Sequence, residues 1–113
     1  MAASQVSVII PTFNRARILP RALDSVLAQT HRADALIVVD DGSTDVTAEL
    51  IATKYPQVEC ISQENYGVSA ARNKGITMTN TDWLAFLDSD DEWLPQKLEW
   101  QMAALKVDCW WVM

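Results

Sequence analysis

The chain alternates short runs of consecutive apolar residues with longer segments in which apolar residues recur every three or four positions. Such runs are typical of strands buried on both faces of a sheet, and they cover residues 6–10, 35–39, 58–62 and 83–87. The helical patterns cover residues 19–27, 43–55, 67–76 and the segment from 95 onward. Strands that alternate with helices predict an α/β fold with a parallel, doubly wound sheet.

Local signals predict where two of the helices begin. Ser43 or Thr44 is expected to cap the second helix, with Val46, Leu50 and Ile51 on one face. Pro95 is expected to start the fourth helix, with one face shared by Leu94, Leu98, Met102 and Leu105.

Polar segments follow three of the predicted strands, at residues 11–14, 40–43 and 88–91. In a doubly wound sheet, ligands bind beyond the carboxyl ends of the strands, so these segments are expected to converge there. Two of them are rich in aspartate. Crowding carboxylates at one edge is unfavourable unless a cation or a hydrogen-bonding ligand compensates their charge. The pattern therefore predicts a binding site.

The segment Asp88-Ser89-Asp90 is a DxD motif that places two carboxylates close together. Carboxylates are the hard oxygen ligands that Mg²⁺ and Mn²⁺ prefer, and an ion held by two of them keeps positions for phosphate oxygens. The alternative is that residues 88–91 only cap the helix that starts near Pro95.

The segments around Asp41 and Arg72 also allow two interpretations each. Asp41, in DDGSTD at residues 40–45, would accept a hydrogen bond from the imide of a pyrimidine base, with Phe13 stacking on the ring. The same hexapeptide is also good turn and cap chemistry, and an aromatic residue at position 13 is equally compatible with packing. Arg72 would support the DxD motif or reach a phosphate, or else form a surface ion pair.

Composition and charge exclude several classes of protein. The 113 residues predict one domain, and 50% apolar with 21% charged residues indicate a globular chain. A net charge of −6 argues against nucleic-acid binding. Two cysteines and one histidine indicate neither zinc nor a disulfide framework, and Cys60 is expected to be buried. The apolar runs are far shorter than a membrane span of about 20 residues. The sequence therefore predicts a cytoplasmic protein, with at most peripheral membrane association.

Taken together, four motifs resemble the family 2 glycosyltransferases, which are nucleotide-sugar-dependent enzymes with the Rossmann-like GT-A fold. The resemblance covers about residues 6 to 106, and its motifs are VSVIIPTFNRARILPRALDSVLAQT, IVVDDGSTD, NYGVSAARNKG and WLAFLDSDDEWLPQKL. Four ordered motifs with matching spacing are far more specific than any one of them.

The resemblance implies a nucleoside-diphosphate-sugar donor, usually a UDP-sugar, with Mn²⁺ or Mg²⁺ as the cofactor. Asp90, with Asp88, is the implied metal ligand. The residues implied at the nucleotide sugar are Pro11, Phe13, Asp41, Arg72 and Asp88. The implied reaction inverts the anomeric centre by direct attack of a hydroxyl from a carbohydrate or lipid-linked acceptor.

The family's general base lies well C-terminal of the DxD motif, whereas this chain ends 23 residues after Asp90. We therefore expect residues 1–113 to be a single nucleotide-sugar-binding domain. It would be the N-terminal portion of a transferase, truncated after about four strand-helix units and without the base. A catalytically incomplete nucleotide-binding or assembly module remains an alternative. A nucleotidyltransferase fits less well, because PTFNRARIL is not the Gly- and Lys-rich loop usual near that class's first strand.

A sheet that ends at its fourth strand also has an unpaired edge, and the last residues are strongly apolar. Open edges and exposed apolar patches usually find partners. We expect a homo-oligomer, with the contact formed at or near Trp110, Trp111, Val112 and Met113.

Overall fold

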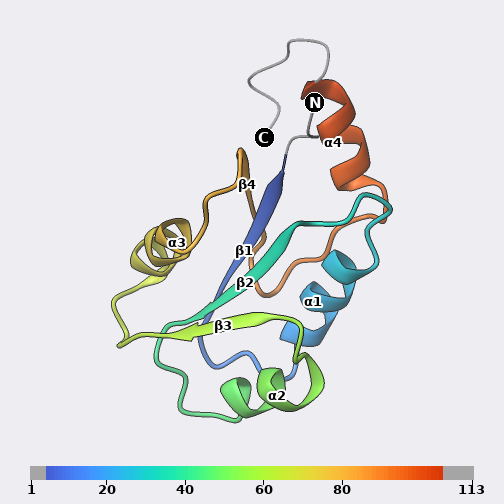
Figure 1. Ribbon diagram of the computed structural model, residues 1–113. Helices are drawn as coiled ribbons and strands as arrows, with labels where there is room; N and C mark the ends of the chain where they lie inside the picture. The colour runs from blue at the N-terminus through green and yellow to red at the C-terminus, as the bar shows by residue number, and fades with distance from the viewer. Residues whose placement is uncertain (1–4, 106–113) are drawn as a thin grey trace.

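A computed structural model describes residues 5–105, which form a four-stranded parallel sheet with helices on both faces (Figure 1). The strand order is β3-β2-β1-β4, so β1 and β2 are central. The strands are β1 (Val6–Thr12), β2 (Ala35–Asp40), β3 (Glu59–Ser62) and β4 (Trp83–Phe86). The helices are α1 (Leu19–Leu27), α2 (Thr47–Lys54), α3 (Val68–Thr77) and α4 (Lys97–Leu105). This arrangement confirms the α/β fold class.

The two faces of the sheet carry cores of different size. Alternate residues of β1 point to opposite faces, and Val8 belongs to the larger core, which α1, α2 and α4 cover. Ile9 belongs to the smaller core on the opposite face, where Ala71 of α3 packs. Among residues 5–105, α3 is the helix that covers this side of the sheet (Figure 1).

The parallel register brings the ends of the central strands together. Thr12, the last residue of β1, pairs with Asp40, the last residue of β2. On the other side of β1, Ile9 pairs with Phe86, the last residue of β4. The loops that follow these three strands therefore leave the sheet at one edge, as the sequence predicts.

Two predicted helix starts are wrong, and three residues expected on an apolar helix face or in the core are exposed. The Ser43 hydroxyl accepts a hydrogen bond from the Asn14 N–H instead of capping a helix, and α2 begins only at Thr47. Val46 just before it is 59% exposed. Leu94 is 68% exposed because α4 begins at Lys97, so Leu94 is outside the helical face that packs. Cys60 is exposed, because β3 is an edge strand with little cover.

β4 forms the other edge of the sheet and pairs only with β1 in the part of the chain that the structure describes. The apolar residues 110–113, on which the expected self-association depends, lie outside the described residues. Between residues 5 and 105, no helix combines the length and the apolar character needed to cross a membrane.

Candidate nucleotide-sugar site

The loops after β1, β2 and β4 enclose a cavity of about 370 Å³ together with the first turns of α3. The six residues singled out from the sequence all line it: Pro11, Phe13, Asp41, Arg72, Asp88 and Asp90. The convergence predicted from the strand ends is therefore present in the structure. Thr12 at the end of β1 and Arg15 in the loop after it also line this cavity. Their position inside the PTFNR motif was the signal that could have identified them.

Asp41 is buried and binds three hydrogen-bond donors from one loop. Its Oδ1 accepts from Gln63 Nε2 at 2.8 Å and from the Tyr66 N–H at 2.9 Å. Its Oδ2 accepts from the Gly67 N–H at 2.9 Å. Burial raises the pKa of Asp41, but the hydrogen bonds from Gln63, Tyr66 and Gly67 together outweigh it and hold the pKa below its usual value. The carboxylate therefore ties the end of β2 to the start of α3 in its ionised form.

The neighbouring Asp40 has the turn role that the sequence also allowed. Its Oδ1 accepts a hydrogen bond from the Ser43 N–H at 2.9 Å. Gly42 adopts a φ of +85°, and a Cβ there would lie 3.1 Å from the Asn65 nitrogen. The turn interpretation thus applies to Asp40, whereas Asp41 reaches a loop more than twenty residues away.

The loop that carries Phe13 is fastened to the loop after β2 by Asn14. Asn14 has a φ of +52°, a region that asparagine tolerates better than most residues. Its Oδ1 accepts hydrogen bonds from the N–H groups of Thr44 and Asp45 at 2.8 and 3.2 Å. Phe13, 40% exposed, is held at the edge of the cavity, where its ring is available for stacking.

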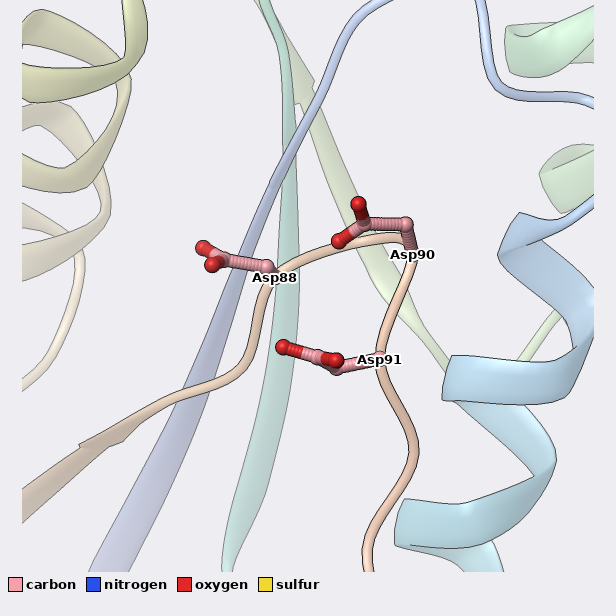
Figure 2. A group of neighbouring side chains, drawn as sticks. All are labelled: Asp88, Asp90 and Asp91. Carbon is pink, nitrogen blue, oxygen red and sulfur yellow. The ribbon is translucent and has the colours of Figure 1, made fainter.

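Three carboxylates gather in the loop after β4 (Figure 2). Asp88, Asp90 and Asp91 each offer an oxygen, and these oxygens lie within 4.8 Å of one another. All three side chains are exposed, so water or a ligand can reach an ion held between them. The cluster ends at Asp91, too many residues before the start of α4 at Lys97 for its side chains to cap that helix. Asp91 was not proposed as a ligand from the sequence, although its place in DSDD was a signal.

Arg72 connects α3 to this acidic cluster. Its Nη2 lies 2.9 Å from Asp88 Oδ1, in a partly exposed ion pair. Two polar atoms of cavity-lining residues are buried and have no partner among residues 5–105, namely Arg72 Nε and Thr12 Oγ1. The cavity wall therefore combines a guanidinium, clustered carboxylates and unsatisfied polar atoms.

Comparison with known proteins agrees with this geometry. The sequence pattern of the family described as "Glycosyl transferase family 2" matches residues 7–109. The chain belongs to this family. An uncharacterized glycosyltransferase of Nostoc sp. is 43% identical over 99 residues, which cover 84% of this chain and 31% of that protein. This family 2 chain thus spans about a third of that relative's length.

Solved structures with the GT-A fold are similar to the chain over nearly its whole length. TarS of S. aureus, residues 1–349, has a TM-score of 0.76 at 26% identity and covers 92% of this chain, which spans 32% of that one. The mannosyltransferase PcManGT of Pyrobaculum calidifontis has a TM-score of 0.75 at 25% identity over 94% of this chain and 32% of its own. The family and the GT-A fold expected from the four motifs are thereby confirmed.

Proposed function

We propose that this chain is the donor-binding portion of an inverting glycosyltransferase. It binds a nucleoside-diphosphate sugar together with a divalent cation, and the sugar passes to a hydroxyl of a carbohydrate or lipid-linked acceptor. The observation that carries the proposal is one cavity lined by Asp41, Phe13 and the carboxylates of Asp88 and Asp90. Similar proteins support it, since TarS has a structure in complex with UDP-GlcNAc and PcManGT one with GDP-Man and Mn²⁺.

The hydrogen bonding of Asp41 favours uracil as the base. A carboxylate has about four lone-pair sites, and donors from Gln63, Tyr66 and Gly67 take three of them. The remaining site, on Oδ2, suits the single imide N–H of uracil. Guanine presents two adjacent N–H donors and would need both oxygens for a paired contact. We therefore propose UDP-sugars as donors, with the base stacked on Phe13.

The acidic cluster fits a divalent cation. Asp90 and Asp88 would hold Mn²⁺ or Mg²⁺, with Asp91 near enough to contribute a third oxygen. When bound there, the ion would neutralise the diphosphate as it departs. Arg72 and Arg15 line the same cavity and add positive charge for the phosphates. This resolves the conflict between an anionic donor and a chain with a net charge of −6.

The acceptor hydroxyl needs a general base. Within residues 5–105, the carboxylates that line the cavity are Asp41, Asp88 and Asp90. In this proposal each of them would hold the donor or the ion. We propose that the base lies outside the described residues. Acceptor-dependent release of UDP from UDP-sugars would identify a transferase. Binding without such release fits both a donor-binding portion that lacks the base and the alternative of a nucleotide-binding or assembly module.

The test of donor binding is calorimetric titration with UDP and GDP, in Mn²⁺ and in EDTA. UDP should bind more tightly than GDP, and only the Mn²⁺ condition should give strong binding. Asp90→Asn should remove most of the metal dependence. Glu49→Gln removes an exposed carboxylate of α2 that does not line the cavity, and it should change nothing. Equal UDP affinity in Mn²⁺ and EDTA would overturn the proposal.

A further inference from the structure

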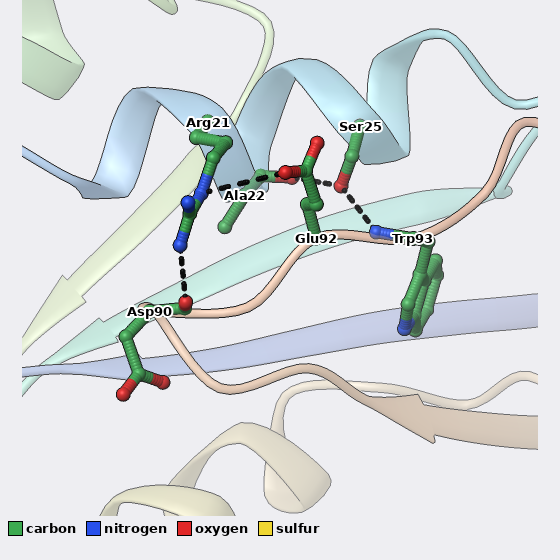
Figure 3. A network of polar contacts seen from close by, with 6 residues as sticks. All are labelled: Arg21, Ala22, Ser25, Asp90, Glu92 and Trp93. Atoms are coloured by element: carbon green, nitrogen blue, oxygen red, sulfur yellow. Dashed lines mark hydrogen bonds and ion pairs between the residues drawn. The ribbon is translucent and has the colours of Figure 1, made fainter.

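A row of polar residues on α1 binds the main chain that follows the acidic cluster (Figure 3). Arg21 and Ser25 lie four positions apart and so share one face of the helix. Arg21 Nη2 donates a hydrogen bond to the Asp90 carbonyl at 2.5 Å. The Trp93 N–H donates to Ser25 Oγ at 3.1 Å, and this hydroxyl donates in turn to the Ala22 carbonyl at 2.8 Å.

Gln29, four positions beyond Ser25 and just past the end of α1, continues the row. Its Nε2 donates to the Leu94 carbonyl at 2.7 Å, and its Oε1 accepts from the Leu98 N–H at 2.9 Å. Gln29 is only 5% exposed, so its bonds are shielded from water. Because these contacts go to the main chain, they set the path of residues 90–98 independently of the side chains in that segment.

Arg21 is the member of the row nearest the proposed metal site. Its guanidinium binds the carbonyl of Asp90, and its Nε lies 3.7 Å from Glu92 Oε1. The carboxylate of Asp90 has no hydrogen bond or ion pair to any residue between 5 and 105. Arg21 thus fixes the backbone of a proposed ligand while leaving the ligand oxygens unoccupied.

We infer that Arg21 is a positioning residue for the metal-binding carboxylates. By holding the Asp90 carbonyl and the Glu92 side chain, it sets the direction in which the Asp90 and Asp91 side chains leave the loop. The inference rests on the proposed function, because it requires that these carboxylates bind a cation. Partners outside a metal's ligand shell that orient its ligands typically change metal affinity about 10- to 100-fold when they are removed.

The sign of the effect separates positioning from simple electrostatics. Removing a cation beside three carboxylates makes the site more negative, so charge alone predicts tighter Mn²⁺ binding by the Arg21→Ala variant. Loss of positioning predicts weaker binding. The side chains of Arg21 and Glu92 are both more than half exposed, so the ion pair contributes little to folding and the variant should fold.

The experiment titrates the full chain with Mn²⁺ and follows free Mn²⁺ by electron paramagnetic resonance, with the melting temperature of each variant measured in parallel. Arg21→Ala should weaken Mn²⁺ binding about tenfold, and Arg21→Lys, which keeps the charge and one donor, should recover part of the loss. Arg32→Ala is the matched control. It removes an exposed arginine whose side chain forms no hydrogen bond or ion pair with residues 5–105, and it should shift affinity less than about twofold.

Ser25→Ala provides a second variant that leaves every charge in place. It frees the Trp93 N–H and should weaken Mn²⁺ binding less than Arg21→Ala does. If Arg21→Ala does not fold, Ser25→Ala and Arg21→Lys decide the question. Unchanged or tighter Mn²⁺ binding in the folded variants would overturn the inference alone. If the wild-type protein does not bind Mn²⁺, or if Asp90→Asn leaves its Mn²⁺ binding unchanged, the proposed function itself is overturned.

Discussion

The guanidinium of Arg72 on α3 lies 2.9 Å from the Asp88 carboxylate, in the loop after β4. This ion pair joins α3 to the acidic cluster. Arg72 binds a carboxylate oxygen of Asp88, a proposed metal ligand, whereas Arg21 binds a main-chain carbonyl. We therefore expect Arg72 to compete with the cation for Asp88 and Arg21 to position the cluster. Removing the two arginines should change the affinity for Mn²⁺ without nucleotide in opposite directions.

Arg72→Met keeps much of the side chain's length and removes its charge. Because the guanidinium no longer competes for Asp88, Mn²⁺ alone should bind up to about fivefold more tightly, the range expected for an exposed ion pair. UDP in the presence of Mn²⁺ should bind more weakly, since a cation beside the phosphates is lost. Paired Mn²⁺ and UDP titrations measure the two effects. A change of the same sign in both would contradict this assignment of roles.

Asp41→Asn should destabilise the fold as well as weaken UDP binding. The new amide nitrogen would face N–H donors of Gln63, Tyr66 or Gly67 and could not accept their hydrogen bonds. The free energy of unfolding, measured in urea, should fall by about 1–3 kcal/mol. The folded-state pKa of Asp41 is lowered, so its stabilisation is full above the usual carboxyl pKa and is lost as pH falls through the folded value. The stability gap between wild type and variant should therefore be constant near neutrality and shrink below about pH 4. A gap independent of pH down to pH 2 would contradict the role of the ionised carboxylate.

Phe13→Ala should weaken UDP binding with little loss of stability. The ring is 40% exposed at the edge of the cavity, so it contributes little to the core. Stacking of a base on an aromatic ring is worth about 1–3 kcal/mol, which is roughly a fivefold or greater loss of affinity. Phe13→Tyr keeps the ring and serves as the control. Equal UDP affinity for the Ala and Tyr variants would show that the ring only packs.

Gly75→Ala should destabilise the protein by about 1–3 kcal/mol through overpacking. A Cβ at this position would lie 2.5 Å from Ile9 Cγ2, where α3 packs closely on β1. Adding Ile9→Ala should partly relieve the clash, so the two changes should be non-additive in urea unfolding.

Gly67→Ala is the matched control for that double mutant. Gly67 has a φ of +100°, and its Cβ would meet no atom within 4 Å. Its cost is backbone strain alone. Its effect should therefore add to that of Ile9→Ala without coupling. Additive behaviour of both glycine variants would contradict the steric account of Gly75.

The secondary structure was predictable where the pattern of apolar residues along the chain is clear. Strands β1 and β2 are continuous apolar runs because both faces are covered, and the structure places them at the centre of the sheet. The predictions failed where a local signal competed with a distant partner. Ser43 is a good capping residue, but its hydroxyl binds the Asn14 N–H. Leu94 fits the apolar spacing of α4 but lies before its first turn, and Gln29 binds its carbonyl.

The sequence by itself determined the order of the elements and the edge of the sheet at which Asp41, Asp88 and Asp90 meet. Apolar periodicity reports which face is buried, and parallel topology places all strand ends on one side. Only the tertiary structure decided which groups bind these three residues. Gln63 on Asp41, Arg72 on Asp88 and Arg21 on the Asp90 carbonyl come from segments 16 to 69 residues away. Hydrogen bonds form over about 3 Å, so their partners follow from the packed positions of helices and loops, which no local pattern encodes.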